Sequence, residues 1–138
     1  MNWILLGLLS AFFAALVAIL GKLGIKGLDT TLATTLRSII MALFLIVIAF
    51  SADKIHGVGS VSTRTWWYII GAGVAGALSW LCYFAALKNG PAGSVAALDR
   101  LSVVFVLIIA ALTLGEKLTT LKIIGGVLLV AGAILVAI

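Results

Sequence analysis

The sequence predicts an all-α membrane protein in which a single domain, residues 1–138, contains five transmembrane helices. Hydrophobic side chains make up 64% of its residues and charged side chains only 9%, with a mean hydropathy of +1.38. A soluble domain carries roughly a quarter of its residues as charges, because its surface faces water. Five long apolar stretches account for this composition, at about residues 3–20, 31–50, 66–87, 95–114 and 121–138.

The length of these stretches fits helices that cross a bilayer. Each has about 18 to 22 residues, which at about 1.5 Å per residue spans a hydrocarbon core of roughly 30 Å. Strands of a membrane barrel have about ten residues of alternating polarity, and the stretches show no such alternation. The first stretch lacks a basic leader and a small-residue cleavage site, so we expect a retained span and not a signal peptide.

The sequence lacks the residue sets that enzymes and metal proteins use. Cys82 is the only cysteine and His56 the only histidine, so neither a disulfide nor a cysteine- or histidine-based metal site is expected. Residues 71–76 match the G-x-G-x-x-G pattern, but they lie inside an unbroken apolar run and not in a soluble βαβ unit. Glycines at this spacing let membrane helices approach closely. We expect no enzyme, no metal and no cofactor.

The basic residues are spread almost evenly over the two sides of the membrane. The net charge is +5, but the basic residues are scattered between apolar stretches, which indicates lipid headgroups and not nucleic acid as their partners. Five spans place the termini on opposite sides. The amino-terminal side then receives Lys54, Arg64, Lys117 and Lys122. The other side receives Lys22, Lys26 and Lys88, with Arg37 and Arg100 slightly inside the membrane.

Because the two sides carry nearly equal numbers of basic residues, the positive-inside rule does not select an orientation for the chain. Two alternatives therefore stay open. The chain either inserts in both orientations and forms an antiparallel homodimer, or it has a fixed topology with a weak charge bias. Small residues in the first and fifth stretches predict helix-packing surfaces, and the fifth stretch is a candidate for the dimer contact.

Three ionisable residues lie within the predicted spans: Arg37, Asp99 and Arg100. Each costs about 2.5–3.5 kcal/mol at a helix centre on insertion scales, so each needs a reason to be there. Arg37 and Asp99 lie at similar depths, roughly 6–10 Å below the same surface. Either they form an ion pair that pins two helices together, or they face a water-filled cavity and contact a solute or a proton. Arg100 points about 100° away from Asp99 around the helix and is expected to reach toward the surface.

Two aromatic residues with polar tips lie deep in the third span. Trp80 and Tyr83 are three residues apart and therefore share one face of the predicted helix. Their rings either pack in the helix interior or stack on an organic solute or a cation. With Arg37 and Asp99, they are the candidate substrate-binding or coupling residues.

The last third of the chain has a distinctive junction between two apolar helices. The apolar run from Leu107 ends in Gly-Glu-Lys-Leu-Thr at residues 115–119, and the next helix contains Gly125, Gly126 and Gly132. In this junction and in its five-span layout, the chain resembles the EamA-like domain of the drug/metabolite transporter superfamily. The resemblance is most specific between about residues 85 and 136.

The resemblance implies that this chain is one half of a larger carrier. Familiar members contain two such domains in inverted orientation, with ten helices around a central cavity. One domain per chain therefore implies a homodimer that completes the cavity, in agreement with the charge balance. The resemblance also implies a junction or gate role for Glu116, to which the residues alone assign no role.

Two differences between this sequence and the family pattern limit which family properties we expect of this chain. The family commonly has a Leu-x-Pro pattern near the start of the fourth helix, where this chain has Leu-Asp-Arg-Leu-Ser at residues 98–102. A charged pair thus replaces an uncharged kink. The small multidrug resistance branch uses an embedded glutamate in its first helix, whereas residues 3–20 contain no acid, so that proton-exchange site is not expected here.

We therefore expect a secondary transporter that moves a small solute or metabolite by alternating access as a dimer. It is expected in a prokaryotic inner membrane, with membrane lipids as its surroundings. Asp99 is the best candidate for proton coupling because it is the only acid within a span. Two alternatives are a flippase for a lipid-linked group and a non-transporting membrane subunit.

Overall fold

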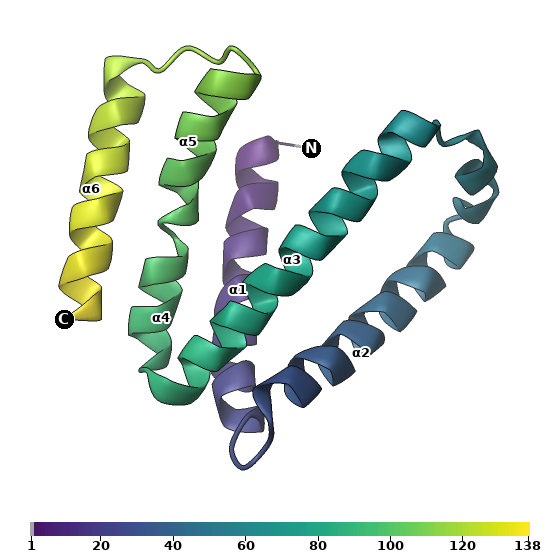
Figure 1. Cartoon of the computed structure of the whole chain (residues 1–138), viewed down its shortest axis with the longest axis horizontal. Helices are drawn as coiled ribbons and strands as arrows, with labels where there is room; N and C mark the ends of the chain where they lie inside the picture. The colour runs from purple at the N-terminus through teal and green to yellow at the C-terminus, as the bar shows by residue number, and fades with distance from the viewer. Residues whose placement is uncertain (1) are drawn as a thin grey trace. The chain divides into compact units, whose positions relative to one another are not determined.

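The computed structural model describes residues 2–138, and its regular elements are all helices (Figure 1). They are α1 (Trp3–Gly24), α2 (Thr30–Ser51), a short 3-10 helix η1 (Ile55–Ser60), α3 (Thr63–Asn89), α4 (Ala92–Asp99), α5 (Ser102–Thr113) and α6 (Thr120–Ala137). Five segments are long and apolar enough to cross a membrane: α1, α2, α3, α4 with α5, and α6. The prediction of an all-helical chain with five candidate membrane-spanning segments is confirmed, whereas its pairing into a ten-helix carrier stays a prediction.

The start of α2 is set by local backbone chemistry that the hydropathy pattern does not reveal. Gly27 has a φ of 77°, which lets the chain turn after α1. Asp29 is the N-cap of α2, and its Oδ1 accepts hydrogen bonds from the amides of Thr31 (2.9 Å) and Leu32 (3.0 Å). A carboxylate here satisfies amides that have no partner within the helix and lies at the positive end of the helix dipole.

The predicted helix over residues 95–114 is interrupted in its middle. α4 ends at Asp99 and α5 begins at Ser102, although this stretch contains no proline. Around the interruption the amide of Leu101 donates to the carbonyl of Leu98 (3.0 Å), and the amide of Val104 donates to that of Leu101 (2.9 Å). These are the i to i+3 bonds of a 3-10 turn, which winds the chain more tightly than an α-helix. The charged pair at 99–100 therefore lies at a change of helix type.

The junction after α5 depends on a left-handed glycine. Gly115 has a φ of 66°, and the amide of Glu116 then folds back to the carbonyl of Ala110 (3.3 Å). Thr119 starts the next helix, because its hydroxyl accepts from the amide of Lys122 (3.4 Å). The Gly-Glu-Lys-Leu-Thr segment is thus a turn that stops one span and caps the next.

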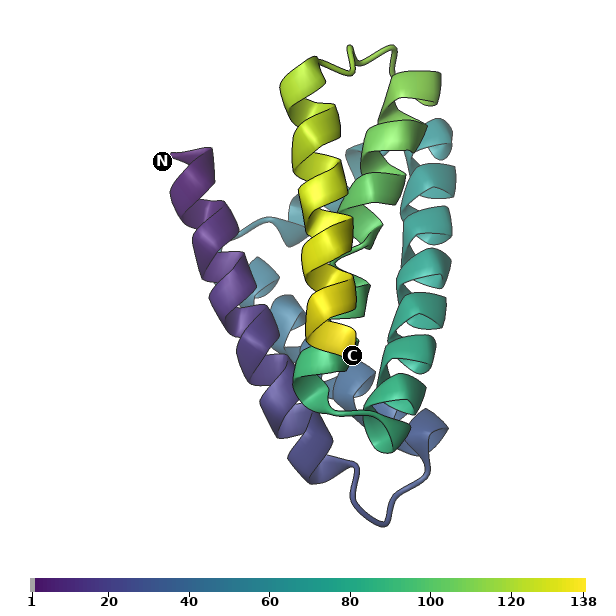
Figure 2. The same cartoon turned by 90° about the vertical axis from the view of Figure 1, so that its left-hand side faces the viewer.

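The chain folds into two compact units, of which the first comprises Met1–Leu23 and Asn89–Ile138. In it, α6 packs along α4 and α5, as Figures 1 and 2 show. Gly126 gives the close approach, since a Cβ there would lie 3.7 Å from Cδ1 of Leu107. Two hydrogen bonds join distant segments of this unit: Ser94 Oγ donates to the carbonyl of Val136 (3.1 Å), and Lys22 Nζ to that of Gly90 (2.8 Å).

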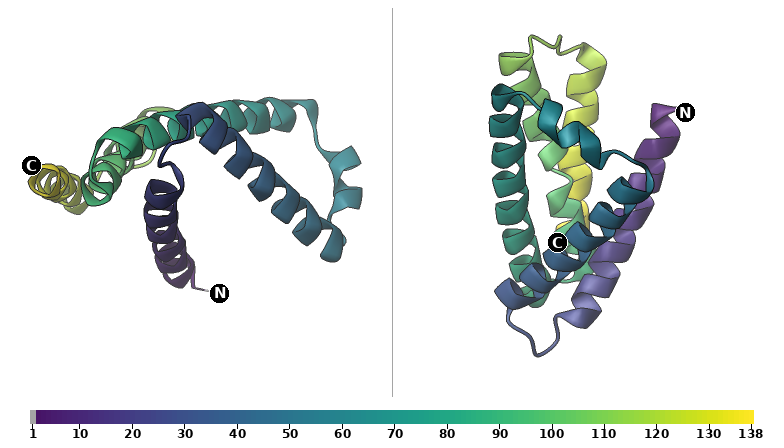
Figure 3. Two further views of the ribbon diagram at one scale, coloured as in Figure 1. Left: turned by 90° about the horizontal axis from the view of Figure 1, so that it is seen from below. Right: turned by 90° about the vertical axis from the view of Figure 1, so that its right-hand side faces the viewer.

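The second unit, Gly24–Lys88, holds α2, η1 and most of α3. α2 and α3 converge where α2 begins and α3 ends, and they diverge toward η1 (Figure 3). The buried residues of this unit lie toward the converging end of the pair: Ile25, Thr34, Phe84 and Leu87. The assignment of residues 1–138 to a single domain remains a prediction.

Asp29 makes the stability of α2 dependent on pH. Its pKa is lowered from the usual 3.8, chiefly by the hydrogen bond from the amide of Leu32. Because the folded-state pKa is the lower one, the stabilisation is complete well above pH 3.8 and is lost as the pH falls through the folded-state pKa. We expect Asp29→Ala to lower the thermal midpoint in detergent at neutral pH, with the difference from wild type shrinking in strong acid.

Asp29→Asn is the matched control for this effect. Asparagine caps helices about as well as aspartate but does not titrate in this range. It should retain most of the stability without the acid dependence of the cap. Equal midpoints for the wild type and Asp29→Ala at neutral pH would contradict the assignment of Asp29 as the cap.

Candidate functional site

Arg37 lies against aromatic rings inside the second unit. It is on α2, seven residues after Thr30, and thus about 10 Å along the helix axis. Its Cζ is 3.6 Å from the centroid of the Trp80 ring and 5.7 Å from that of Phe84, both on α3. The short distance to Trp80 is a cation–π contact, which is worth about 0.5–2 kcal/mol depending on desolvation.

Three rings of α3 form the aromatic side of this site. The centroids of Trp80 and Tyr83 are 5.5 Å apart with an interplanar angle of 79°, and Trp80 and Phe84 are 5.9 Å apart. Tyr83 and Phe84 are 6.3 Å apart. Edge-to-face rings at such separations attract one another, and the spacing of three and four residues places all three on one side of the helix.

Phe84 is the member of this cluster that sequence reasoning missed. It lies four residues after Trp80 and is only 4% exposed. The signal was present, because an i, i+4 aromatic pair on a helix forms one surface. Phenylalanine has no polar tip, however, so nothing in the sequence distinguished it from the other apolar residues of the span.

One nitrogen of Arg37 has no protein partner. Its Nη1 is buried and donates to no acceptor among residues 2–138. The acids of its own unit are Asp29 and Asp53. Asp29 caps α2, and Asp53 lies 3.5 Å from His56 in the loop at the other end of that helix. Within the unit, therefore, the Arg37 cation is stabilised by rings and not by a carboxylate.

The structure places the other predicted site residues in the first unit. Asp99 is the last residue of α4, and both Asp99 and Arg100 are exposed there. Arg100 borders a shallow groove with Ala97 of α4 and the small residues Gly125, Gly132 and Ala133 of α6. An Arg37–Asp99 pair would join the two units, and it stays a prediction.

Glu116 forms an ion pair at the α5–α6 junction. Its Oε2 lies 3.3 Å from Nζ of Lys122, and both side chains are about half exposed. An exposed pair of this kind contributes about 0–1 kcal/mol. The pair links the turn to the first helical turn of α6, and the junction or gate role of Glu116 stays a prediction.

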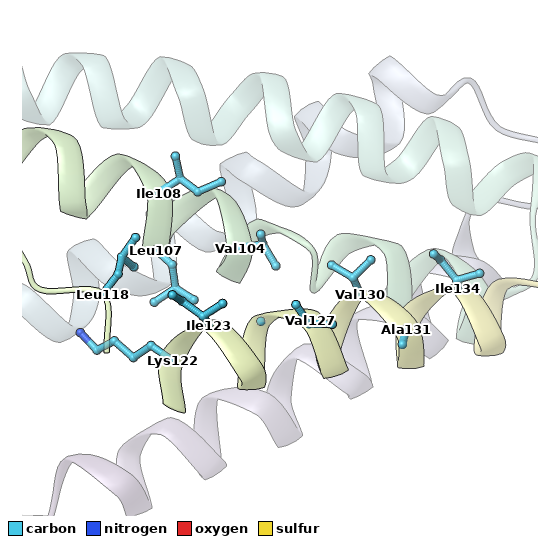
Figure 4. A pocket seen from close by; sticks show the side chains of 11 residues that line it. Val104, Leu107, Ile108, Leu118, Lys122, Ile123, Val127, Val130, Ala131 and Ile134 are labelled. Carbon is cyan, nitrogen blue, oxygen red and sulfur yellow. The ribbon is translucent and has the colours of Figure 1, made fainter. Parts of the chain in front are cut away.

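A second groove, between α5 and α6, has a different character. It has a volume of about 450 Å³, and apart from the Lys122 side chain its lining is apolar (Figure 4). The labelled side chains of Val104, Leu107 and Val127 point into it. Since Lys122 already pairs with Glu116, this groove suits an acyl chain or another helix better than a polar solute.

The Arg37–Trp80 contact should appear as an energetic coupling. In a double-mutant cycle of Arg37→Gln and Trp80→Leu, we expect about 0.5–2 kcal/mol of coupling from unfolding in detergent. The matched control is Arg64 with Tyr68, at 5.9 Å on the exposed start of α3. That cycle should give a value near zero, and equal values for the two cycles would refute the contact.

Comparison with known proteins identifies the family. The sequence profile of the EamA-like transporter family matches residues 1–138. A Sinorhizobium sp. protein called "Uncharacterized transporter in cobO 3'region" is 38% identical over 137 residues, covering 99% of this chain and 97% of that protein. "Uncharacterized transporter sll1164" of Synechocystis sp. is 30% identical over 132 residues, covering 92% of this chain and 37% of that protein. No solved structure matches the chain. The chain is therefore a multi-pass membrane protein of the EamA-like transporter family, which is a family of transporters and not of enzymes.

Proposed function

We propose that this chain carries a small solute across the membrane by alternating access, as one half of a carrier that a second copy completes. Its membership of a transporter family, with five spans in the chain, is the observation that carries this proposal. Inverted-repeat carriers place the solute site between two related halves near the bilayer midplane. A second copy in the opposite orientation supplies the missing half.

The lengths of the two relatives support a paired unit. The Synechocystis relative is matched over 37% of its length, so it has room for a second region of this size. The Sinorhizobium relative is matched over 97% of its length, so it consists almost entirely of one such region. Two copies of a short chain such as the Sinorhizobium relative, or one longer chain such as the Synechocystis relative, are each consistent with a ten-helix carrier.

The charge distribution supports the opposite orientation of the two copies. The amino-terminal side carries Lys54, Arg64, Lys117 and Lys122, and the other side carries Lys22, Lys26 and Lys88 near the surface. A bias of one charge is too small to hold every copy in one orientation. We propose dual insertion into a prokaryotic inner membrane, and both relatives come from prokaryotes.

The proposed roles of the site residues follow from their positions. Arg37, Trp80 and Tyr83 form the solute-binding side of the carrier, because they bring a cation and stacked rings together inside the spans. Asp99 couples transport to protons, and it adjoins the 3-10 turn at which its span changes winding. Such interruptions often mark hinges. Glu116, with Lys122, acts at the α5–α6 junction.

The groove between α5 and α6 favours a second candidate function. Its apolar lining matches an acyl chain, which a lipid-linked-group flippase would need to hold. Uptake of soluble metabolites without movement of lipid probes separates a solute carrier from a flippase. A purified chain that moves neither would indicate a non-transporting subunit.

Dual insertion predicts that one loop is reached from both sides of the membrane. Cys82→Ser removes the only cysteine, and Ser60→Cys then places one thiol in the exposed η1 segment without changing any charge. A maleimide that cannot cross membranes should label about half of this thiol in intact cells, since the two orientations are nearly balanced. Permeabilised cells should give full labelling.

Added charge provides the control for this experiment. Gly57→Lys with Gly59→Lys in the same segment should shift the population to one orientation, so that labelling in intact cells moves toward none or all. Complete or absent labelling of the parent protein would contradict dual insertion.

Proton coupling through Asp99 predicts a selective transport defect. Asp99→Asn in proteoliposomes should abolish uptake driven by a pH gradient, because the amide cannot carry a proton between the two sides. Solute binding should remain. Asp53→Asn, which changes an exposed loop acid, is the matched control and should transport normally. Full pH-driven uptake by Asp99→Asn would remove this residue from the coupling mechanism.

A further inference from the structure

We propose that Arg37, with the rings of Trp80, Tyr83 and Phe84, binds the anionic group of the transported solute. The solute class is then an organic anion: a carboxylate on a flat or apolar body. This inference rests on the proposed function, since it assigns a substrate class to the same site. It is carried by the unsatisfied donor of Arg37 and by the rings that hold the guanidinium in place.

The stacked geometry leaves one nitrogen of the guanidinium, Nη1, without a hydrogen-bond acceptor among residues 2–138. Its Cζ lies 3.6 Å from the Trp80 centroid, so the ring contacts the face of the cation. The five N–H donors of arginine lie in the plane of the group and point outward from its edge. Within residues 2–138, Nη1 has neither an acceptor nor exposure to water. A carboxylate matches this planar fork with two parallel hydrogen bonds.

The depth of the Arg37 site along its helices argues against a role for Arg37 as an anchor at the lipid headgroups. Arg37 lies about 10 Å along α2 from Thr30, and Trp80 lies about 13 Å along α3 from its end at Asn89. An arginine that reaches the headgroups extends its side chain toward the surface. Here the guanidinium instead packs on a ring at similar depth and on Phe84, at 5.7 Å.

The counter-charge of Arg37 must come from outside its own unit. Asp29 is held by the amides of Thr31 and Leu32, and Asp53 lies beside His56 at the other end of α2. Because Glu116 of the first unit pairs with Lys122, three candidate sources are left: a solute anion, a lipid phosphate and Asp99. The rings of Trp80 and Tyr83, which are both partly exposed, favour the solute, because they offer stacking surface for an organic body, which neither a phosphate nor a second side chain requires.

Fluorescence of Trp80 gives a direct measurement of this site. Replacing Trp3, Trp66 and Trp67 by Phe leaves Trp80 as the only tryptophan of the full chain. This protein, in nanodiscs of phosphatidylcholine, is titrated with cyclohexanecarboxylate, with the neutral cyclohexanecarboxamide and with the cation cyclohexylmethylammonium. None of the three absorbs where tryptophan emits. We expect saturable binding of the carboxylate at least about tenfold tighter than of the amide, from charge-assisted hydrogen bonds.

Two arginine variants test whether the preference belongs to Arg37. Arg37→Gln should remove the preference for the carboxylate over the amide, and Arg37→Lys should restore only part of it, because lysine lacks the planar fork. Arg64→Gln is the matched control, since Arg64 also lies over a ring, that of Tyr68, but at an exposed position. It should keep the full preference. Circular dichroism of each variant confirms that the helices remain intact.

Further measurements test whether Asp99 or a lipid phosphate, and not the solute, supplies the negative charge beside Arg37. If Asp99 is the partner of Arg37, Asp99→Asn should raise carboxylate affinity by about tenfold or more and the wild type should bind poorly, which overturns the proposal. If lipid phosphate is the partner, Trp80 emission should differ between phosphatidylcholine and phosphatidylglycerol discs and ignore the carboxylate, which also overturns it. No response to any probe, or equal binding of all three, overturns it as well.

The outcome is independent of whether the chain transports. Binding in nanodiscs is an equilibrium measurement that needs neither a gradient nor a second compartment. A chain that prefers the neutral or cationic probe contradicts the anion assignment and leaves the carrier proposal intact. A chain that binds the carboxylate at Arg37 but moves no solute in proteoliposomes contradicts the carrier proposal and leaves the binding site intact.

Discussion

The bilayer core offers no water to hydrogen-bond with, and this constraint governs every span of the chain. Helices satisfy their own amides and carbonyls, so only side chains and helix ends need further partners. The hydroxyls of the spans follow the same rule. Thr34 Oγ1 donates to the carbonyl of Thr30 (2.7 Å), Ser38 Oγ to that of Thr34 (2.8 Å), and Thr113 Oγ1 to that of Ile109 (2.8 Å). A guanidinium is too large and too charged to be satisfied in this way, which is why Arg37 stands apart.

Little of the stability of this chain comes from a buried core. Leu87 is the only large side chain among residues 2–138 that is fully buried, and most large apolar side chains of the spans are exposed. In lipid such exposure costs little, because lipid tails are as apolar as leucine. Helix association then depends on close approach at small residues, such as Gly126 against Leu107. The small-residue groove beside Arg100 leaves another such surface free for a neighbouring helix.

The spans were predictable from the sequence, whereas the features that position the site were not. Hydropathy identifies each span to within a few residues, because a run of some twenty apolar residues has few other uses. The interruption after Asp99 escapes this reasoning, since it changes the backbone winding and not the polarity. Arg37 and Trp80 were each candidates from polarity alone. Their contact depends on how α2 and α3 are rotated about their axes, which a pattern that is apolar all round leaves undetermined.

The charges inside the spans bear on which solute the proposed two-chain carrier accepts. The interior of the spans holds two arginines, Arg37 and Arg100, and one acid, Asp99. Each copy therefore has one more cation than acid at depth, and a pair of copies has two more cations than acids. Pairing Asp99 with Arg100 leaves Arg37 without a carboxylate, and pairing it with Arg37 leaves the exposed Arg100 to reach the headgroups. Because an uncompensated charge in hydrocarbon is costly, a carrier built from two such chains is electrostatically suited to an anionic solute, and a proton on Asp99 would strengthen that preference in the state that binds it.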